Sequence, residues 1–187
     1  MKEITIKKSL IQFSVGICVL FVILGLIPLT VLQITEENRQ PSEKRLVSQW
    51  RAEAGDTFHI TWTHSVTNQP VKEVYQINDN LMIGIQEMFF NEHGPNLPFG
   101  PEGGTQWEIR DGMFRVYNYD TVFEALPVRI GQIVADHTLY YQEHIIALRE
   151  VSRPGGFVMI RARRINVIRF LFEEGKLWLT KKKIRNI

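Results

Sequence analysis

The chain has 187 residues, enough for one domain with a single core plus one anchoring segment, and too few for two full domains. Its one cysteine, Cys18, lies in an apolar stretch, which excludes a disulfide framework, a Cys-based zinc site and a cysteine nucleophile from the rest of the chain. The net charge of +2 hides an uneven distribution, because residues 1–35 carry +2, residues 36–156 carry −7 and residues 157–187 carry +7.

The N-terminal segment is apolar. From Ser9 to Thr35, Cys18 is the only ionisable side chain. A 20-residue helix over Phe13–Leu32 would be about 30 Å long, which matches the hydrocarbon core of a bilayer. We therefore expect residues 1–35 to form a cytoplasmic tail and one transmembrane helix. A cleaved signal peptide is the main alternative, but the apolar run is long for one and its end lacks a small-x-small cleavage site.

The charges beside this segment predict its orientation. Lys7 and Lys8 directly precede the apolar run, whereas Glu36 and Glu37 follow it. Short basic tails normally remain in the cytoplasm. The predicted location is thus the cytoplasmic membrane, crossed once, with residues 36–187 outside the cytoplasm.

The remaining chain is predicted to be all-β. Residues 36–55 are polar and contain Pro41, so we expect a stalk there, followed by an extracytoplasmic β-domain over residues 56–187. Apolar and polar side chains then alternate, as in strands with one buried face. The expected strands are Phe58–Val66, Val71–Ile77, Leu81–Phe90, Trp107–Ile109, Met113–Tyr119, Pro127–Val134, Thr138–Gln142, His144–Val151, Phe157–Arg163, Ile168–Phe172 and Leu177–Thr180. About ten short strands with frequent turns predict an antiparallel β-sandwich or barrel.

Several of these strands carry a family resemblance. The blocks concerned are Phe58–Val66 with Pro70-Val71 and Glu73, then Val128–Leu139, then Pro154-Gly155. They resemble the "HSV…PV-x-E" opening and later blocks of the proteins catalogued as domain of unknown function 1850, over roughly residues 58–163. The family has no established activity. The resemblance implies association with solute transporters of the tripartite ATP-independent periplasmic (TRAP) class, through the membrane subunit or the solute-binding protein.

The first of these blocks contains the candidate polar cluster. His64 and Ser65 are adjacent in a predicted strand, so they point to opposite faces and cannot form a hydroxyl–imidazole pair. His64 shares the apolar face with Trp62, which favours a core histidine bonded to Glu73 of the next strand. The same geometry allows a pocket for a ligand or cation, or an acid–base site with His137. No catalytic residue is assigned.

A long loop over residues 91–104 is rich in Gly and Pro. It departs from the usual Gly-Ala-Gly-Leu-Pro-like turn of the family, since residues 93–98 read His-Gly-Pro-Asn-Leu-Pro. Its candidate ligand-binding residues, for calcium or for covering a pocket, are Asn91, His93, Asn96 and Glu102. A plain surface loop is the alternative. The histidine spacings match no local metal signature and no nucleotide-binding glycine motif occurs, so no metal or cofactor is expected.

The basic C-terminal end is the last feature. Lys181, Lys182, Lys183 and Arg185 are interpreted as solvated, or as contacting anionic lipid or cell-wall polymer, and nucleic acid is not an expected partner. Taken together, the sequence predicts a non-enzymatic, membrane-anchored accessory domain that assists a TRAP-type transporter. The alternatives are a ligand- or calcium-sensing module and a hydrolase-like enzyme using His64 and Glu73.

Overall fold

The computed structural model describes residues 2–37 and 44–185, with side chains for residues 12–37 and 44–180. The chain divides into two compact units. The larger unit comprises residues 32–163, and the smaller unit comprises residues 1–31 and 164–187. Each unit is described by itself below.

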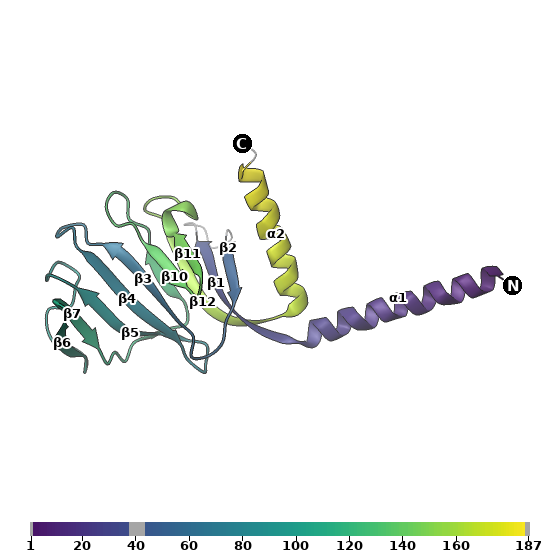
Figure 1. Ribbon diagram of the computed structural model, residues 1–187, viewed down its shortest axis with the longest axis horizontal. Coiled ribbons are helices and arrows are strands. Elements are labelled where there is room, and N and C mark those ends of the chain that lie inside the picture. Colours follow the sequence, from purple (N-terminus) through teal and green to yellow (C-terminus); the bar gives the residue numbers. More distant parts are fainter. Residues whose placement is uncertain (1, 38–43, 186–187) are drawn as a thin grey trace. The chain divides into compact units, whose positions relative to one another are not determined.

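The larger unit is a β-sandwich. The strands of the described residues are β1 (Pro28–Glu37), β2 (Lys44–Arg51), β3 (Thr57–Thr63), β4 (Pro70–Ile77), β5 (Ile83–Phe90), β6 (Gln106–Arg110), β7 (Met113–Tyr117), β8 (Val122–Phe123), β9 (Leu126–Arg129), β10 (Thr138–Tyr141), β11 (His144–Ala147) and β12 (Phe157–Asn166), with a 3-10 turn at Leu148–Glu150. One sheet has the order β2-β1-β12-β9, and the other has the order β11-β10-β3-β4-β5-β7-β6, with β8 also paired to β5. Figure 1 labels β3, β4 and β5 side by side in the larger of the two sheets. The predicted antiparallel sandwich is therefore confirmed.

The two sheets share one hydrophobic core. Leu32 of β1 and Ile160 of β12 lie in the same buried cluster as Phe58 and Ile60 of β3. The alternation read from residues 58–66 explains this, because every second side chain of β3 points toward the facing sheet.

Two predicted strand connections are confirmed. Strands β3, β4 and β5 form the expected antiparallel meander. Strands β6 and β7 form a hairpin through Asp111 and Gly112, which have φ angles of 51° and 76°. Two successive residues with positive φ give the turn whose twist suits a two-residue hairpin, and Gly adopts such a φ at no steric cost.

The end of the apolar N-terminal helix differs from the prediction. Helix α1 spans Lys2–Leu26, and strand β1 begins at Pro28, so the helix does not reach Leu32. Proline has no N–H to donate and its ring clashes with the preceding helical turn, which ends the helix here. Over the part of the chain that the structure describes, no helix combines the length and apolar composition needed to cross a membrane.

The predicted stalk is also corrected. Residues 36–55 contain the end of β1 and the whole of β2, both in the four-stranded sheet. Residues 38–43, including Pro41, lie outside the described residues. The error arose because charged side chains in β1 and β2 obscure the strand pattern, although these charges are paired within the sheet.

The last two predicted strands are wrong, because residues 167–185 form one helix, α2 (Val167–Arg185). Asn166 caps this helix by accepting a 2.8 Å hydrogen bond from the Arg169 N–H. Arg169 also bonds Glu173 one turn later, at 2.8 Å. The prediction read Glu173-Glu-Gly-Lys176 as a turn, whereas these four residues lie inside α2, which the two local interactions stabilise.

Candidate functional site

The turn between β3 and β4 holds the most strongly predicted polar residue, His64. Its N–H donates to the Gln69 carbonyl at 2.8 Å, and its own carbonyl accepts from the Asn68 N–H at 2.8 Å. Asn68 has a φ of 55°, a conformation that Asn tolerates better than most residues. Two backbone hydrogen bonds thus close this turn, and Ser65 lies exposed on it.

The His64 imidazole is 3% exposed and both of its nitrogens have partners. Nδ1 accepts from the Thr67 N–H at 3.2 Å and lies 3.0 Å from the Thr67 hydroxyl. Because Nδ1 accepts a backbone proton, the ring proton is on Nε2, which donates to the Pro95 carbonyl at 2.9 Å. His64 is the predicted core histidine, but its partners are Thr67 and Pro95 rather than Glu73.

Gln69 fastens the long loop to the same turn. Its side-chain oxygen accepts from the N–H groups of Asn91 and Glu92 at 2.6 and 2.5 Å, and its side-chain amide donates to the Glu92 carbonyl. Gly94 lies flat against the His64 ring, where an added Cβ would be 2.6 Å from Cε1. We call His64, Thr67, Gln69, Gly94 and Pro95 the loop clasp. These residues hold the start of the loop by hydrogen bonds and by contact with one buried ring.

Glu73 occupies the core-facing side of the larger sheet. It lies opposite Ile60 of β3 and Met88 of β5. Burial raises the pKa of its carboxyl, although hydrogen bonds from the Tyr75 hydroxyl, at 3.2 Å, and from the Trp62 side chain favour the charged form. Glu73 is therefore a carboxyl group held among apolar side chains, with hydrogen bonds from Tyr75 and Trp62.

Two further polar groups lie near Glu73 or Trp62. The Tyr119 hydroxyl is buried without a hydrogen-bond partner among the described residues, and burial together with the charge of Glu73 raises its pKa to about 12. The His137 ring stacks on Trp62 at 5.7 Å, burial lowers its pKa, and its Nδ1 likewise has no partner in the described chain. We call Trp62, Glu73, Tyr75, Tyr119 and His137 the inner polar group. Unpaired buried polar atoms of this kind suit a bound water or a polar ligand.

His93, a predicted ligand residue of the loop, lies in an aromatic cluster. Its ring centroid is 4.5 Å from that of Phe114, 4.9 Å from Phe99 and 5.7 Å from both Phe90 and Trp107. Phe90 is fully buried, so the cluster continues into the core. The role of His93 in this geometry is to pack the loop against β5, β6 and β7.

The other predicted loop residues serve its turns. Asn91 offers its backbone N–H to Gln69, and Asn96 has a positive φ of 65°. The Glu102 N–H bonds the Thr105 hydroxyl at 3.1 Å. Across residues 2–37 and 44–185, no group of three His, Cys, Asp or Glu side chains is arranged to hold a metal ion. Lys181, Lys182, Lys183 and Arg185 follow Thr180 in α2, and their side chains lie outside the described residues.

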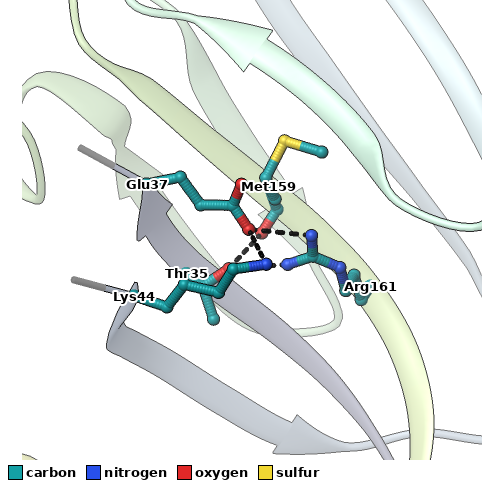
Figure 2. Close-up of polar contacts among 5 residues, drawn as sticks. All are labelled: Thr35, Glu37, Lys44, Met159 and Arg161. Carbon is teal, nitrogen blue, oxygen red and sulfur yellow. Dashed lines mark hydrogen bonds and ion pairs between the residues drawn. The ribbon is translucent and has the colours of Figure 1, made fainter. Parts of the chain in front are cut away.

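One polar network was missed at the sequence level. Figure 2 shows Glu37 of β1 between Lys44 of β2 and Arg161 of β12, at 3.1 and 2.8 Å. Arg161 also donates to the Thr35 hydroxyl at 3.0 Å (Figure 2). Burial acts to raise the pKa of Glu37, but the hydrogen bonds and charges of Arg161 and Lys44 lower it overall. The network joins three neighbouring strands, and no local spacing could have revealed it.

The loop clasp and the inner polar group fall in one continuous stretch of sequence. Residues 58–148 match the family model described as "Domain of unknown function (DUF1850)". The resemblance read from the sequence is confirmed for this stretch, whereas the Pro154-Gly155 block lies beyond it. No curated protein and no solved structure matches the chain. The DUF1850 description names neither an activity nor a partner. Of the motif His64-Ser65-Val66, His64 belongs to the loop clasp, whereas Ser65 and Val66 are exposed.

Proposed function

We propose that the chain is a non-enzymatic accessory domain attached to the cytoplasmic membrane through α1. The observation that carries this proposal is the surface of that helix. Among the described side chains of α1, nine large apolar ones between Phe13 and Leu26 are 41–76% exposed. Water penalises such a surface by about 25 cal/mol per Å², and soluble domains rarely display apolar patches this continuous. Contact with lipid would remove this apolar surface of α1 from water.

The proposed topology follows from the flanking charges. Lys7 and Lys8 favour a cytoplasmic N-terminus, whereas Glu36 and Glu37 are the last residues of β1, within the sandwich. The sandwich is therefore proposed to lie outside the cytoplasm. There it would assist a TRAP-type transporter, by docking on the membrane subunit or on the solute-binding protein, as the family resemblance implies.

The geometry of the loop clasp supports a non-enzymatic role. A general base needs a nitrogen free to accept the substrate's proton. Both nitrogens of His64 are bonded within the clasp, and Glu73 takes its hydrogen bonds from Tyr75 and Trp62. The hydrolase-like alternative would need His64 or Glu73 free to accept a proton, and their hydrogen bonds do not support it.

Cys18 supplies a direct test of membrane attachment, because it is the only thiol and lies on α1. In membranes containing the full chain, a membrane-impermeant maleimide should leave Cys18 unlabelled until detergent is added. A second variant, Glu102→Cys in a Cys18→Ala background, reports the loop of the sandwich. It should be labelled from outside intact, wall-free cells. Labelling of Glu102→Cys only in inverted vesicles would reverse the topology, and a chain recovered free of lipid would remove the attachment.

The partner is tested separately. The full chain, tagged at its C-terminus and extracted in mild detergent, should co-purify with the membrane subunit or the solute-binding protein of a TRAP transporter. A variant in which the exposed Phe99 is changed to Ser tests whether the loop contributes to docking. Purification without any TRAP component, from cells that express one, contradicts this part of the proposal.

A second candidate function, a ligand- or calcium-sensing module, is favoured by the inner polar group. The buried Tyr119 hydroxyl and His137 Nδ1 lack partners among the described residues, and Glu73 interacts electrostatically with Tyr119. A ligand that binds only the folded chain must raise its melting temperature. Thermal melts of the detergent-solubilised full chain with calcium, magnesium or small polar solutes test this candidate, with Glu73→Gln as the variant that should lose the response.

A further inference from the structure

We propose that α2 lies on an anionic bilayer surface with one apolar face in the lipid. Leu171, Phe172 and Leu179 are 57–61% exposed, and Trp178, also exposed, lies beside them. Residues spaced by seven or eight positions fall on the same side of a helix. These four side chains therefore form a continuous apolar stripe, with Gly175 between its two ends.

A separate polar stripe runs along the same helix. It consists of Arg169, Glu173, Lys176 and Thr180, which are spaced by three or four residues. Arg169 bonds Glu173 at 2.8 Å, and the Thr180 hydroxyl donates to the Lys176 carbonyl at 3.0 Å. The Lys176 ammonium lies 4.3 Å from the centre of the Phe172 ring. α2 thus has the two-sided surface of a helix that lies in a membrane interface.

The smaller unit brings the beginning of α2 to the end of α1. The Val167 N–H donates to the Ile27 carbonyl at 3.2 Å. A Cβ on Gly25 would lie 3.5 Å from the Ile168 side chain. If α1 inserts into the bilayer, its C-terminal end reaches the membrane surface, and α2 starts at that depth. The first turn of α2 is therefore held among the lipid headgroups.

The charge of the C-terminal segment indicates which partner covers the apolar face of α2. Residues 157–187 carry nine basic and two acidic side chains, and Lys181, Lys182, Lys183 and Arg185 follow directly after the apolar stripe. Anionic lipid attracts such a segment, whereas a second copy of the same basic helix would be repelled. A bilayer containing anionic lipid is the partner that satisfies both the apolar and the charged side chains.

The inference rests on the proposed attachment through α1, and one experiment separates the two. The full chain is reconstituted into vesicles of phosphatidylcholine, alone or mixed with phosphatidylglycerol, in which the acyl chains carry bromine. Bromine quenches tryptophan only on contact. Trp50, Trp62 and Trp107 belong to the sandwich and α1 has no tryptophan, so comparison with Trp178→Phe isolates the signal of α2.

The expected result is a Trp178 component of quenching that appears with phosphatidylglycerol and weakens in high salt. Leu179→Glu should abolish this component, because it places a charge in the apolar stripe. Thr180→Glu should retain it, because the same charge is then on the polar stripe, and this variant is the matched control.

Each of the other outcomes contradicts either the inference about α2 or the proposed attachment through α1. If the chain floats with the vesicles but Trp178 is never quenched, the inference is wrong and the attachment through α1 survives. The same holds if Leu179→Glu leaves quenching unchanged, or if quenching does not depend on phosphatidylglycerol. A blue-shifted Trp178 emission without quenching indicates a protein partner and also overturns the inference. If the chain does not float with the vesicles, the proposed function itself fails.

Discussion

Phe90 in the sandwich is fully buried, whereas Phe172 on α2 is 61% exposed. A similar contrast separates many apolar side chains of the two units. Those of the larger unit supply the shared core, whereas many of those on α1 and α2 are exposed. Apolar residues in the larger unit contribute to the free energy of folding. The exposed apolar residues of the smaller unit are suited to contact with lipid, as proposed above.

The largest expected effect breaks this contrast directly. Phe90→Ala removes a buried ring that packs against Trp107 and Phe114, and the cavity should cost about 3–5 kcal/mol of unfolding free energy. Phe172→Ala, the matched change on α2, should cost less than about 0.5 kcal/mol. Urea unfolding of the full chain in mild detergent measures both values. Equal losses for the two variants would show that α2 is packed as firmly as the core.

The next effect concerns the loop clasp. Gly94→Ala places a Cβ 2.6 Å from Cε1 of the buried His64 ring, so the ring or the loop must shift. Overpacking of this kind costs about 1–3 kcal/mol. Gly100→Ala is the control in the same loop, because nothing lies within 4 Å of its added Cβ. Thermal melts should separate the two variants, and equal melting temperatures would mean that the clasp does not restrain the loop.

The sandwich was largely predictable from sequence, for local reasons. Strand β3 alternates apolar and polar residues, and the Asp111-Gly112 hairpin uses the residues that its positive φ angles favour. Both features are fixed by near neighbours in the chain. The clasp was predictable only in part. The alternation of residues 58–66 predicted a buried His64, but β3 ends at Thr63 and His64 lies in the turn that follows. Its bond to Pro95 depends on a loop 31 residues away.

In the mispredicted segments, one sequence pattern favoured the wrong secondary structure and another feature of the same segment determined the observed one. The run through Pro28 reads as one apolar segment by composition, but a proline ends the helix and the β-branched residues after it join a sheet. In α2, the Glu-Gly-Lys sequence resembles a turn, but the Asn166 cap and the Arg169–Glu173 pair stabilise the helix. The Glu37–Arg161 pair joins residues 124 positions apart, beyond any local signal.

A smaller effect of opposite sign is expected at Glu73 in the core. Its pKa is raised, so the protonated form suits the fold, and the stability that it contributes below about pH 4.5 is lost as pH rises through the folded value. Glu73→Gln keeps the side chain neutral and can still accept from Tyr75. It should therefore stabilise the chain by about 1 kcal/mol at pH 7 and have little effect in acid. Chemical unfolding at the two pH values tests this, and destabilisation at pH 7 contradicts it.

The smallest expected effect compares ion pairs of the two units. The pKa of Glu37 is lowered by Arg161 and Lys44 despite partial burial, so its contribution is present above the ordinary value of 4.5 and is lost as pH falls through the lower folded value. Glu37→Gln should cost about 0.5–1 kcal/mol at neutral pH and nothing in strong acid.

Glu173→Gln is the matched change in the smaller unit, where Glu173 pairs with Arg169 one helical turn away. An i,i+4 ion pair on a helix contributes about 0.3–0.5 kcal/mol. Glu37 bridges three strands of the sandwich, so its removal should lower the urea midpoint more than that of Glu173. High salt should reduce both effects, because mobile ions screen charge pairs that water can reach. If Glu173→Gln proves the more costly change, then α2 contributes to folding beyond its own local pairs, and the contrast between the two units must be redrawn.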